Sequence, residues 1–254
     1  MSKIWSREET IIALNLYCKI PFGKLSSRNE TIKKHAKVLG RTTDSLVMKM
    51  CNIARLDPEL QRRGVKGLSQ GAKMEEIVWN EFIDNPELLA YQSELLLAKL
   101  KKERIEDIIK TNPTYLPEGE ERETIIRQRV GQNFFRTVVI TSYNYTCCIT
   151  GLKNEHLVEA CHISDWASDI KNRTNPQNGL CMSSMFHTAY DRKLMSVTPD
   201  YNIVISDEMI ESATKPDLKD YLNSLNNRQI ILPERFVPSP SLLENNYEIF
   251  IKNR

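Results

Sequence analysis

The chain has 254 residues, of which 41% are hydrophobic and 27% are charged, and this is ordinary for a globular protein with one large domain or two modest ones. It has no apolar run near the ~20 residues of a membrane span, and its first residues do not resemble a signal peptide. Its six cysteines do not indicate a disulfide scaffold in a chain of this length. We therefore expect a cytoplasmic protein with reduced thiols and no membrane partner.

The net charge of +2 hides a strong asymmetry along the chain. Residues 1–73 hold fifteen Lys and Arg against six Asp and Glu, whereas the remaining residues hold twenty against twenty-seven. A basic N-terminal third suits a polyanionic partner. A well-solvated helical surface explains many lysine-rich segments equally well, so the charge needs support from a motif.

Two capped helices are predicted at the start of the chain. Ser6 and Glu9 have the spacing of a capping box, and apolar residues follow at helical period as far as Tyr17. Asn29 is expected to cap a second helix, which Gly40 ends as a left-handed cap.

A third helix is predicted after Thr42 or Thr43, either of which can cap it. Ala36, Gly40 and Leu46 fall where a helix-turn-helix needs a small residue, a turn glycine and a buried apolar residue. The unit resembles the trihelical DNA readers of the Myb and homeodomain type, in which the third helix enters the major groove of double-stranded DNA. A plain interaction module is the alternative. The residues expected to be exposed and to contact DNA are Arg41, Thr43, Ser45, Lys49 and Asn52.

The middle of the chain is predicted to connect two domains. Residues 74–84 suggest another helix, and Pro86 is expected to start a long amphipathic helix to about Lys110, which could serve a homodimer. Residues 111–119 contain two prolines and form the expected linker. The predicted domains are a helical DNA-binding domain at 1–85, a connecting helix and linker at 86–118, and a third region at 119–254 with its core at 143–206.

The C-terminal region mixes short strands with helices. After a helix at 120–141, residues 155–163 read as a strand, residues 179–183 as a second strand and residues 184–193 as a helix. Residues 194–206 read as a β-hairpin. The whole chain is therefore predicted to be an α+β protein that is mostly helical.

Four short motifs in this region carry a family resemblance. They are CCITG at 147–151, EACHI at 159–163, NPQNGL at 175–180 and HTAYD at 187–191. Strand, loop, strand and helix with His, Asn and His in that order resembles the ββα-metal arrangement of HNH endonucleases, closest to a bacterial and phage restriction-type branch, over residues 140–206. The resemblance implies a metal-dependent endonuclease that hydrolyses DNA, in restriction or phage defence.

The chemistry of phosphodiester hydrolysis assigns roles to these residues. His162 is the candidate general base, because imidazole titrates near neutral pH, and the resemblance implies that a backbone carbonyl positioned by Asn178 holds its other ring nitrogen. His187 and Asp191 are four residues apart on a predicted helix, so they share a face and could ligate one divalent ion. The expected catalytic residues are His162, Asn178 and His187. A lone strand histidine is more often structural, and Asn-Gly alone only signals a turn, so the ordered set carries the prediction.

Cys161 stands where many HNH sites have an aspartate that binds the metal. A thiolate suits Zn²⁺ or another transition metal better than Mg²⁺, so Mg²⁺, Mn²⁺, Ni²⁺ and Zn²⁺ all stay open as the cofactor. Cys161 is a third candidate ligand, a small core residue or a sign of weak activity. Family members with Glu-Ala-x-His-Ile also lack that aspartate, so core packing is favoured for Cys161. A structural zinc site built from Cys147, Cys148, Cys161 and Cys181 is disfavoured, because the chain has no CxxC pair.

Two rival functions remain open from the sequence. One is a non-catalytic DNA-binding regulator with a degenerate HNH fold, which the missing aspartate before His162 supports. The other is cleavage of RNA or nicking of structured nucleic acid. Retention of His162, Asn178 and His187 together favours a catalyst over the regulator.

Overall fold

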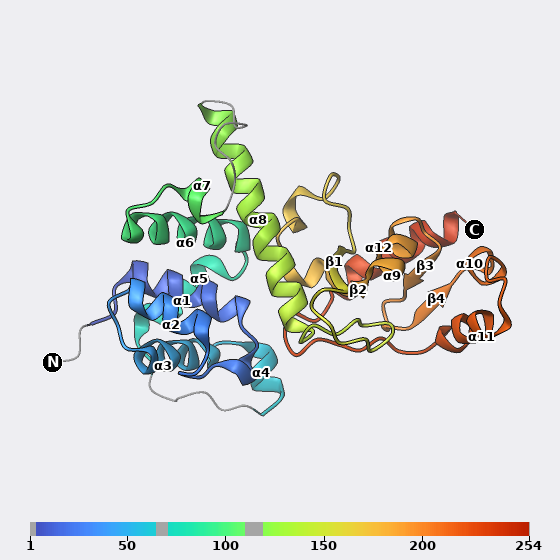
Figure 1. The fold of residues 1–254 in the computed structure, drawn as a ribbon, viewed down its shortest axis with the longest axis horizontal. Coiled ribbons are helices and arrows are strands. Elements are labelled where there is room, and N and C mark those ends of the chain that lie inside the picture. Colours follow the sequence, from blue (N-terminus) through green and yellow to red (C-terminus); the bar gives the residue numbers. More distant parts are fainter. Residues whose placement is uncertain (1–3, 65–70, 110–118, 254) are drawn as a thin grey trace. The chain divides into compact units, whose positions relative to one another are not determined.

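A computed structural model describes residues 4–64, 71–109 and 119–253 (Figure 1). The chain divides into two compact units, Met1–Phe134 and Phe135–Arg254. The division falls inside the longest described helix, α8 (Glu120–Ser142), which begins and ends close to the predicted positions. The predicted linker at 111–119 lies outside the described residues except for Gly119.

The first unit is helical. Its predicted helix starts are confirmed, because Ser6 and Glu9 form a capping box and the Asn29 side chain accepts hydrogen bonds from two backbone amides. Gly40 has a φ of +62°, the left-handed value that favours glycine after a helix. The elements are α1 (Arg7–Lys19), η1 (Phe22–Lys24), α2 (Glu30–Val38), α3 (Thr43–Ala54), α4 (Pro58–Arg62), α5 (Lys73–Phe82), α6 (Pro86–Lys101) and α7 (Ile105–Ile108).

Helix α1 lies at the centre of this unit. Every residue from Glu9 to Cys18 is buried, and α1 packs against α3, α5 and α6. A helix buried on all sides belongs to a core and not to a surface layer. The three predicted helices are present, but the core they share with α5 and α6 extends beyond the predicted trihelical unit.

The predicted continuous helix from Pro86 to about Lys110 is wrong. Helix α6 ends at Lys101, and Lys102 follows with a left-handed φ of +56°. The amide of Glu103 then donates to the carbonyl of Ala98 at 3.0 Å, which closes the helix end, and the short α7 follows. Nothing in the residue type at 102 signals this break, since lysine is a good helix former.

The second unit is built around the predicted ββα order. Strands β1 and β2 pair antiparallel with His162 opposite Gly179, and β3 and β4 form the predicted hairpin. The first strand begins at 158 and not at 155. After α8 the elements are β1 (Val158–His162), η3 (Ile170–Asn172), η4 (Pro176–Asn178), β2 (Gly179–Ser183), α9 (Ser184–Asp191), β3 (Met195–Val197), β4 (Ile203–Ile205), α10 (Asp207–Glu211), α11 (Pro216–Leu225) and α12 (Pro240–Lys252).

The described residues therefore confirm an α+β protein that is mostly helical, with two small sheets. Strand β2 approaches the end of α8 so closely that a Cβ added at Gly179 would lie 2.3 Å from the Val139 side chain. A glycine is thus required at the position opposite His162. Within the described residues, no helix has the length and apolar character needed to cross a membrane.

Helix α12 fixes the chain where it leaves β1. The buried Asn246 donates its amide to the carbonyl of Ile163 at 2.8 Å, and its side-chain oxygen accepts from the Ser196 hydroxyl at 3.2 Å. Because a buried amide with both ends bonded has little freedom, this bridge holds the segment after His162 in one place.

Candidate active site

The His162 ring is held on three sides. It stacks on Phe135 with ring centroids 3.7 Å apart and planes 9° from parallel, and it meets the Trp166 ring in a T-shaped arrangement with centroids 5.6 Å apart. Its Nε2–H donates to the carbonyl of Arg173 at 3.0 Å. The hydrogen bond to a carbonyl assigns the proton to Nε2 and leaves Nδ1 with a free lone pair when the ring is neutral.

Partial burial also changes the pKa of the His162 imidazole. Burial lowers the pKa of His162, and the hydrogen bond to the Arg173 carbonyl offsets only part of this effect. A neutral imidazole is therefore favoured at neutral pH, as a proton acceptor requires.

Asn178 organises the loop that carries this carbonyl. Its side chain is fully buried, accepts from the Ser164 amide at 2.7 Å, and donates to the carbonyls of Ser164 at 3.0 Å and Asn172 at 3.1 Å. Asn172 directly precedes Arg173, whose carbonyl contacts His162. Asn178 thus bonds the residue before the one whose carbonyl contacts His162, and its role in positioning that carbonyl stays a prediction.

Each ring nitrogen of His187 faces a carboxylate. Its Nδ1 donates to Glu159 Oε2 at 2.6 Å, and its Nε2 lies 3.4 Å from Asp191 Oδ2. Glu159 also accepts from the Ser184 hydroxyl at 2.8 Å, and the hydrogen bond from His187 is the main reason that the pKa of Glu159 is lowered. A carboxylate on one imidazole nitrogen orients the ring so that the other nitrogen is presented to a cation.

Cys161, His187 and Asp191 form a potential metal site. One donor atom from each lies within 4.8 Å of the others, and within the described residues these three make up the single group of this kind. Sulfur, nitrogen and oxygen donors together fit a transition ion such as Zn²⁺ better than Mg²⁺. Burial raises the pKa of the Cys161 thiol well above its ordinary value, so a bound cation would have to displace its proton.

The other buried thiols do not join this group. Cys147, Cys148 and Cys181 lie in the hydrophobic core of the second unit, together with Cys161. Across the described part of the chain they form no four-thiol cluster of metal-binding geometry.

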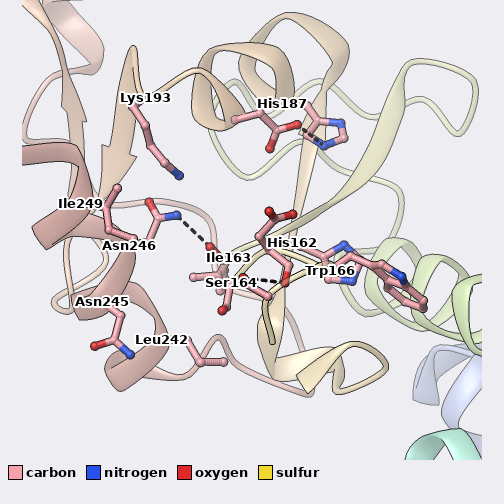
Figure 2. A pocket seen from close by; sticks show the side chains of 13 residues that line it. His162, Ile163, Ser164, Trp166, His187, Lys193, Leu242, Asn245, Asn246 and Ile249 are labelled. Atoms are coloured by element: carbon pink, nitrogen blue, oxygen red, sulfur yellow. Dashed lines mark hydrogen bonds and ion pairs between the residues drawn. The ribbon is translucent and has the colours of Figure 1, made fainter. Parts of the chain in front are cut away.

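The two histidines lie in the lining of one pocket. It has a volume of about 540 Å³, and both His162 and His187 line it (Figure 2). Asp191 and Lys193 line the same pocket, and α12 contributes a further wall through residues that include Asn246. The site thus offers a proton acceptor and a potential cation site to one bound group.

A comparison with known families identifies part of this unit. Residues 147–198 match the family model described as HNH endonuclease. This HNH segment contains His162, Asn178 and His187, and the match supports nuclease chemistry on nucleic acid. It covers about a fifth of the chain, and no curated protein matches the sequence significantly.

Some residues of the site were missed by sequence reasoning. Glu159 stands in one of the four motifs without an assigned role, although its position two residues before Cys161 on a strand places both on one face. Phe135 lies outside the HNH segment and stacks on His162 from α8. No sequence pattern connects Phe135 to His162, because only the tertiary packing brings them together.

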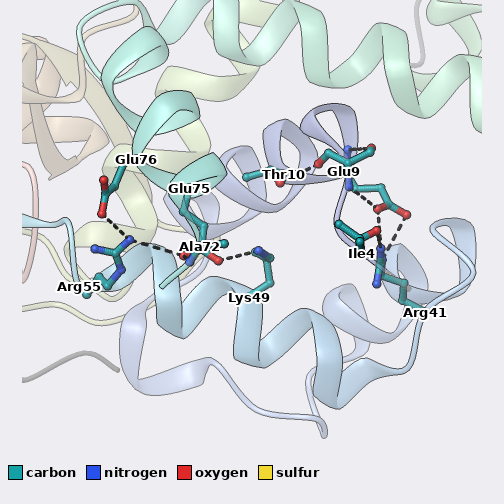
Figure 3. Close-up of polar contacts among 10 residues, drawn as sticks. Ile4, Glu9, Thr10, Arg41, Lys49, Arg55, Ala72, Glu75 and Glu76 are labelled. Atoms are coloured by element: carbon teal, nitrogen blue, oxygen red, sulfur yellow. Dashed lines mark hydrogen bonds and ion pairs between the residues drawn. The ribbon is translucent and has the colours of Figure 1, made fainter. Parts of the chain in front are cut away.

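Two of the five residues expected to contact DNA, Arg41 and Lys49, are placed differently from the prediction (Figure 3). Arg41 is largely buried, pairs with Glu9 at 2.6 Å and lies over the Trp5 ring at 3.9 Å. Lys49 is buried and pairs with Glu75 at 2.5 Å. The expected exposure of these two cations is therefore wrong, because carboxylates from α1 and α5 hold them inside the unit.

The three remaining residues of that set lie on α3 with intermediate burial. They are Thr43, Ser45 and Asn52. The amide of Ser45 donates to the Thr42 side chain, so this turn serves as the helix cap. DNA contact through these three residues stays a prediction.

Proposed function

We propose that this protein is a metal-dependent endonuclease that hydrolyses phosphodiester bonds of double-stranded DNA. The observation that carries the proposal is the single pocket lined by His162 and His187. One ring has an unprotonated nitrogen to accept a proton, and the other is oriented by a carboxylate beside a possible cation site. A scaffold histidine needs neither arrangement.

In the proposed reaction, Nδ1 of His162 takes a proton from a water molecule that attacks the phosphorus. The Arg173 carbonyl bonds the Nε2–H and stabilises the imidazolium that forms. The bond between phosphorus and the 3′ oxygen breaks as the new P–O bond forms. The products are a 5′-phosphate and a 3′ oxygen that takes up a proton from solvent.

His187, Asp191 and Cys161 would hold one divalent ion in this scheme, with Glu159 orienting His187. The ion supplies charge stabilisation for the phosphate and the leaving oxygen. Phe135 and Trp166 limit the motion of the His162 ring, so that the base is positioned before substrate binds.

Cleavage of supercoiled plasmid tests the proposal. The protein is incubated with Mg²⁺, Mn²⁺, Ni²⁺ or Zn²⁺, and His162→Ala is compared with His156→Ala, which alters an exposed histidine outside the pocket. We expect cleavage by the native protein and by His156→Ala, and a loss of at least a hundredfold in His162→Ala, since general-base catalysis contributes roughly 10²–10⁴-fold. DNA binding without cleavage under every ion would favour the non-catalytic regulator, and cleavage of RNA alone would favour the other rival.

We further propose that the first unit binds the DNA backbone through cations near α2 and not through Arg41 or Lys49. Those two would have to leave buried ion pairs to reach a phosphate, which is costly. A group of exposed basic side chains lies between η1 and the end of α2. These residues are Lys24, Arg28, Lys33, Lys34 and Lys37.

Charge neutralisation tests this surface. Arg28→Gln, Lys34→Gln and Lys37→Gln are combined and compared with Lys215→Gln and Lys252→Gln, which remove exposed cations from the second unit. For every phosphate that a variant no longer binds, the slope of log affinity against log salt should fall by about 0.9. An unchanged slope in the triple variant would refute a DNA contact on this surface.

The biological setting and the assembly are part of the same proposal. Restriction or phage defence follows from the resemblance of the motifs, and phage plating on cells that express the protein or His162→Ala tests it. A homodimer would place two sites on the two strands of a duplex, and the molar mass in solution tests that. The helix first expected to mediate a dimer ends at Lys101.

A further inference from the structure

We propose that Lys193 is a substrate-binding residue whose ammonium contacts a non-bridging oxygen of the DNA phosphate in the pocket. The inference rests on the proposed nuclease function and assigns a role that neither the motifs nor the family match gives. Among the described residues that line the pocket, Lys193 is the one lysine or arginine. Figure 2 shows its side chain directed into the pocket that His162 and His187 also line.

The backbone conformation at the end of α9 positions the Lys193 side chain. The amide of Lys193 donates to the Tyr190 carbonyl at 3.1 Å, and the amide of Leu194 donates to the Ala189 carbonyl at 2.9 Å. This pair of bonds is a Schellman motif, and Lys193 occupies its left-handed position with a φ of +59°. Glycine is the residue that adopts this conformation without strain, so lysine here costs stability.

The left-handed conformation alone does not mark a site. Lys102 has a similar φ of +56° at the end of α6. Lys193 differs from Lys102 because its position follows directly from the helix that carries His187 and Asp191, and because its side chain enters their pocket. A strained residue beside a site is evidence for a role when the side chain also reaches the site.

The charges that line the pocket support a phosphate-binding role for Lys193. Asp165 and Asp191 line the same pocket and, without a bound cation, would repel an approaching phosphodiester. The Lys193 side chain is half-buried and lies over the Tyr190 ring at 5.4 Å, and within the described residues its ammonium forms no direct ion pair. A lysine ammonium that lines the pocket and has no carboxylate partner is suited to bind an anionic oxygen.

The test measures binding of a fluorescent duplex by anisotropy over a range of salt concentrations, with EDTA present so that no cleavage occurs. The variants are Lys193→Met, Lys193→Arg and Lys193→Gly. The matched control is Arg192→Met, which removes an exposed cation one residue away that does not line the pocket. Thermal unfolding of each variant is measured in parallel.

We expect Lys193→Met to bind roughly tenfold more weakly, with a salt slope lower by about 1, because the variant lacks one charge-assisted hydrogen bond to phosphate. Lys193→Arg should recover most of the affinity, and Arg192→Met should bind like the native protein. Lys193→Gly should unfold at a higher temperature than the native protein and yet bind as weakly as Lys193→Met. This opposite response separates substrate binding from a purely structural role.

Three outcomes would overturn the inference. These are equal effects of Lys193→Met and Arg192→Met on the salt slope, full affinity in Lys193→Gly, and no DNA binding by the native protein. Failure of the proposed nuclease function looks different, because the native protein would then bind DNA and respond to Lys193→Met without cutting under any ion. The two hypotheses are therefore tested separately.

Discussion

Replacing Asn178 should loosen one loop in a way that can be followed at single amides. The buried side chain makes three hydrogen bonds to the backbone of Ser164 and Asn172. At about 1 kcal/mol for each bond, Asn178→Ala should lower the free energy of unfolding by about 3 kcal/mol. Asn178→Asp keeps an acceptor for the Ser164 amide but loses both donor bonds, so it should remove part of this stability.

Hydrogen exchange of two neighbouring amides provides the assay. The Ser164 amide donates to the Asn178 side chain, whereas the Ile163 amide donates to the Asn178 backbone carbonyl. In Asn178→Ala we expect the Ser164 amide to exchange at least tenfold faster than before relative to the Ile163 amide, and in Asn178→Asp we expect its protection to be retained. Unchanged protection of Ser164 in Asn178→Ala, or equal changes at both amides, would refute a specific role for this side chain in holding the loop.

Three further predictions concern the metal group and the first unit. Cys161→Asp should shift the ion that best supports cleavage from Zn²⁺ towards Mg²⁺ or Mn²⁺, and an unchanged order of ions in the plasmid assay would exclude the thiol as a ligand. Glu159→Gln should weaken ion binding by about 10–100-fold in calorimetry, because His187 loses the carboxylate that orients it; equal affinity would contradict this. Arg41→Met should destabilise the first unit by about 3–5 kcal/mol in urea unfolding, because it leaves the Glu9 carboxylate without its buried cation, and a change below about 1 kcal/mol would show that the pair is unimportant.

Local signals in the sequence predicted much of the fold. Helix starts at Ser6 and Asn29 were predictable because caps depend on residues two or three positions apart. The end of α6 was missed, since Lys102 adopts a conformation that its residue type does not indicate. Strand β1 was predicted too long because residues 155–157 belong to a turn, in which the Leu157 amide donates to the Asn154 carbonyl at 3.1 Å.

The order of the site residues along the chain could be predicted, but the residues that contact them could not. His162 and His187 could be chosen from motif spacing, but the contact between Glu159 and His187 spans 28 positions and depends on strand register. Burial of Arg41 has the same origin, because Glu9 lies 32 positions away on another helix. Ion pairs between distant elements have no periodic pattern in sequence, so an exposed and a buried arginine look alike there.

The anchoring of the Ile163 carbonyl by Asn246 has a consequence for how the nuclease segment could be moved between proteins. A graft limited to residues 147–198 would contain both histidines but would leave behind Phe135, α12 and the partner strand of β3. Two-stranded sheets are marginal by themselves. Swapping experiments should therefore transfer everything from Phe135 to α12 as one segment, because the residues that support the two histidines lie outside residues 147–198.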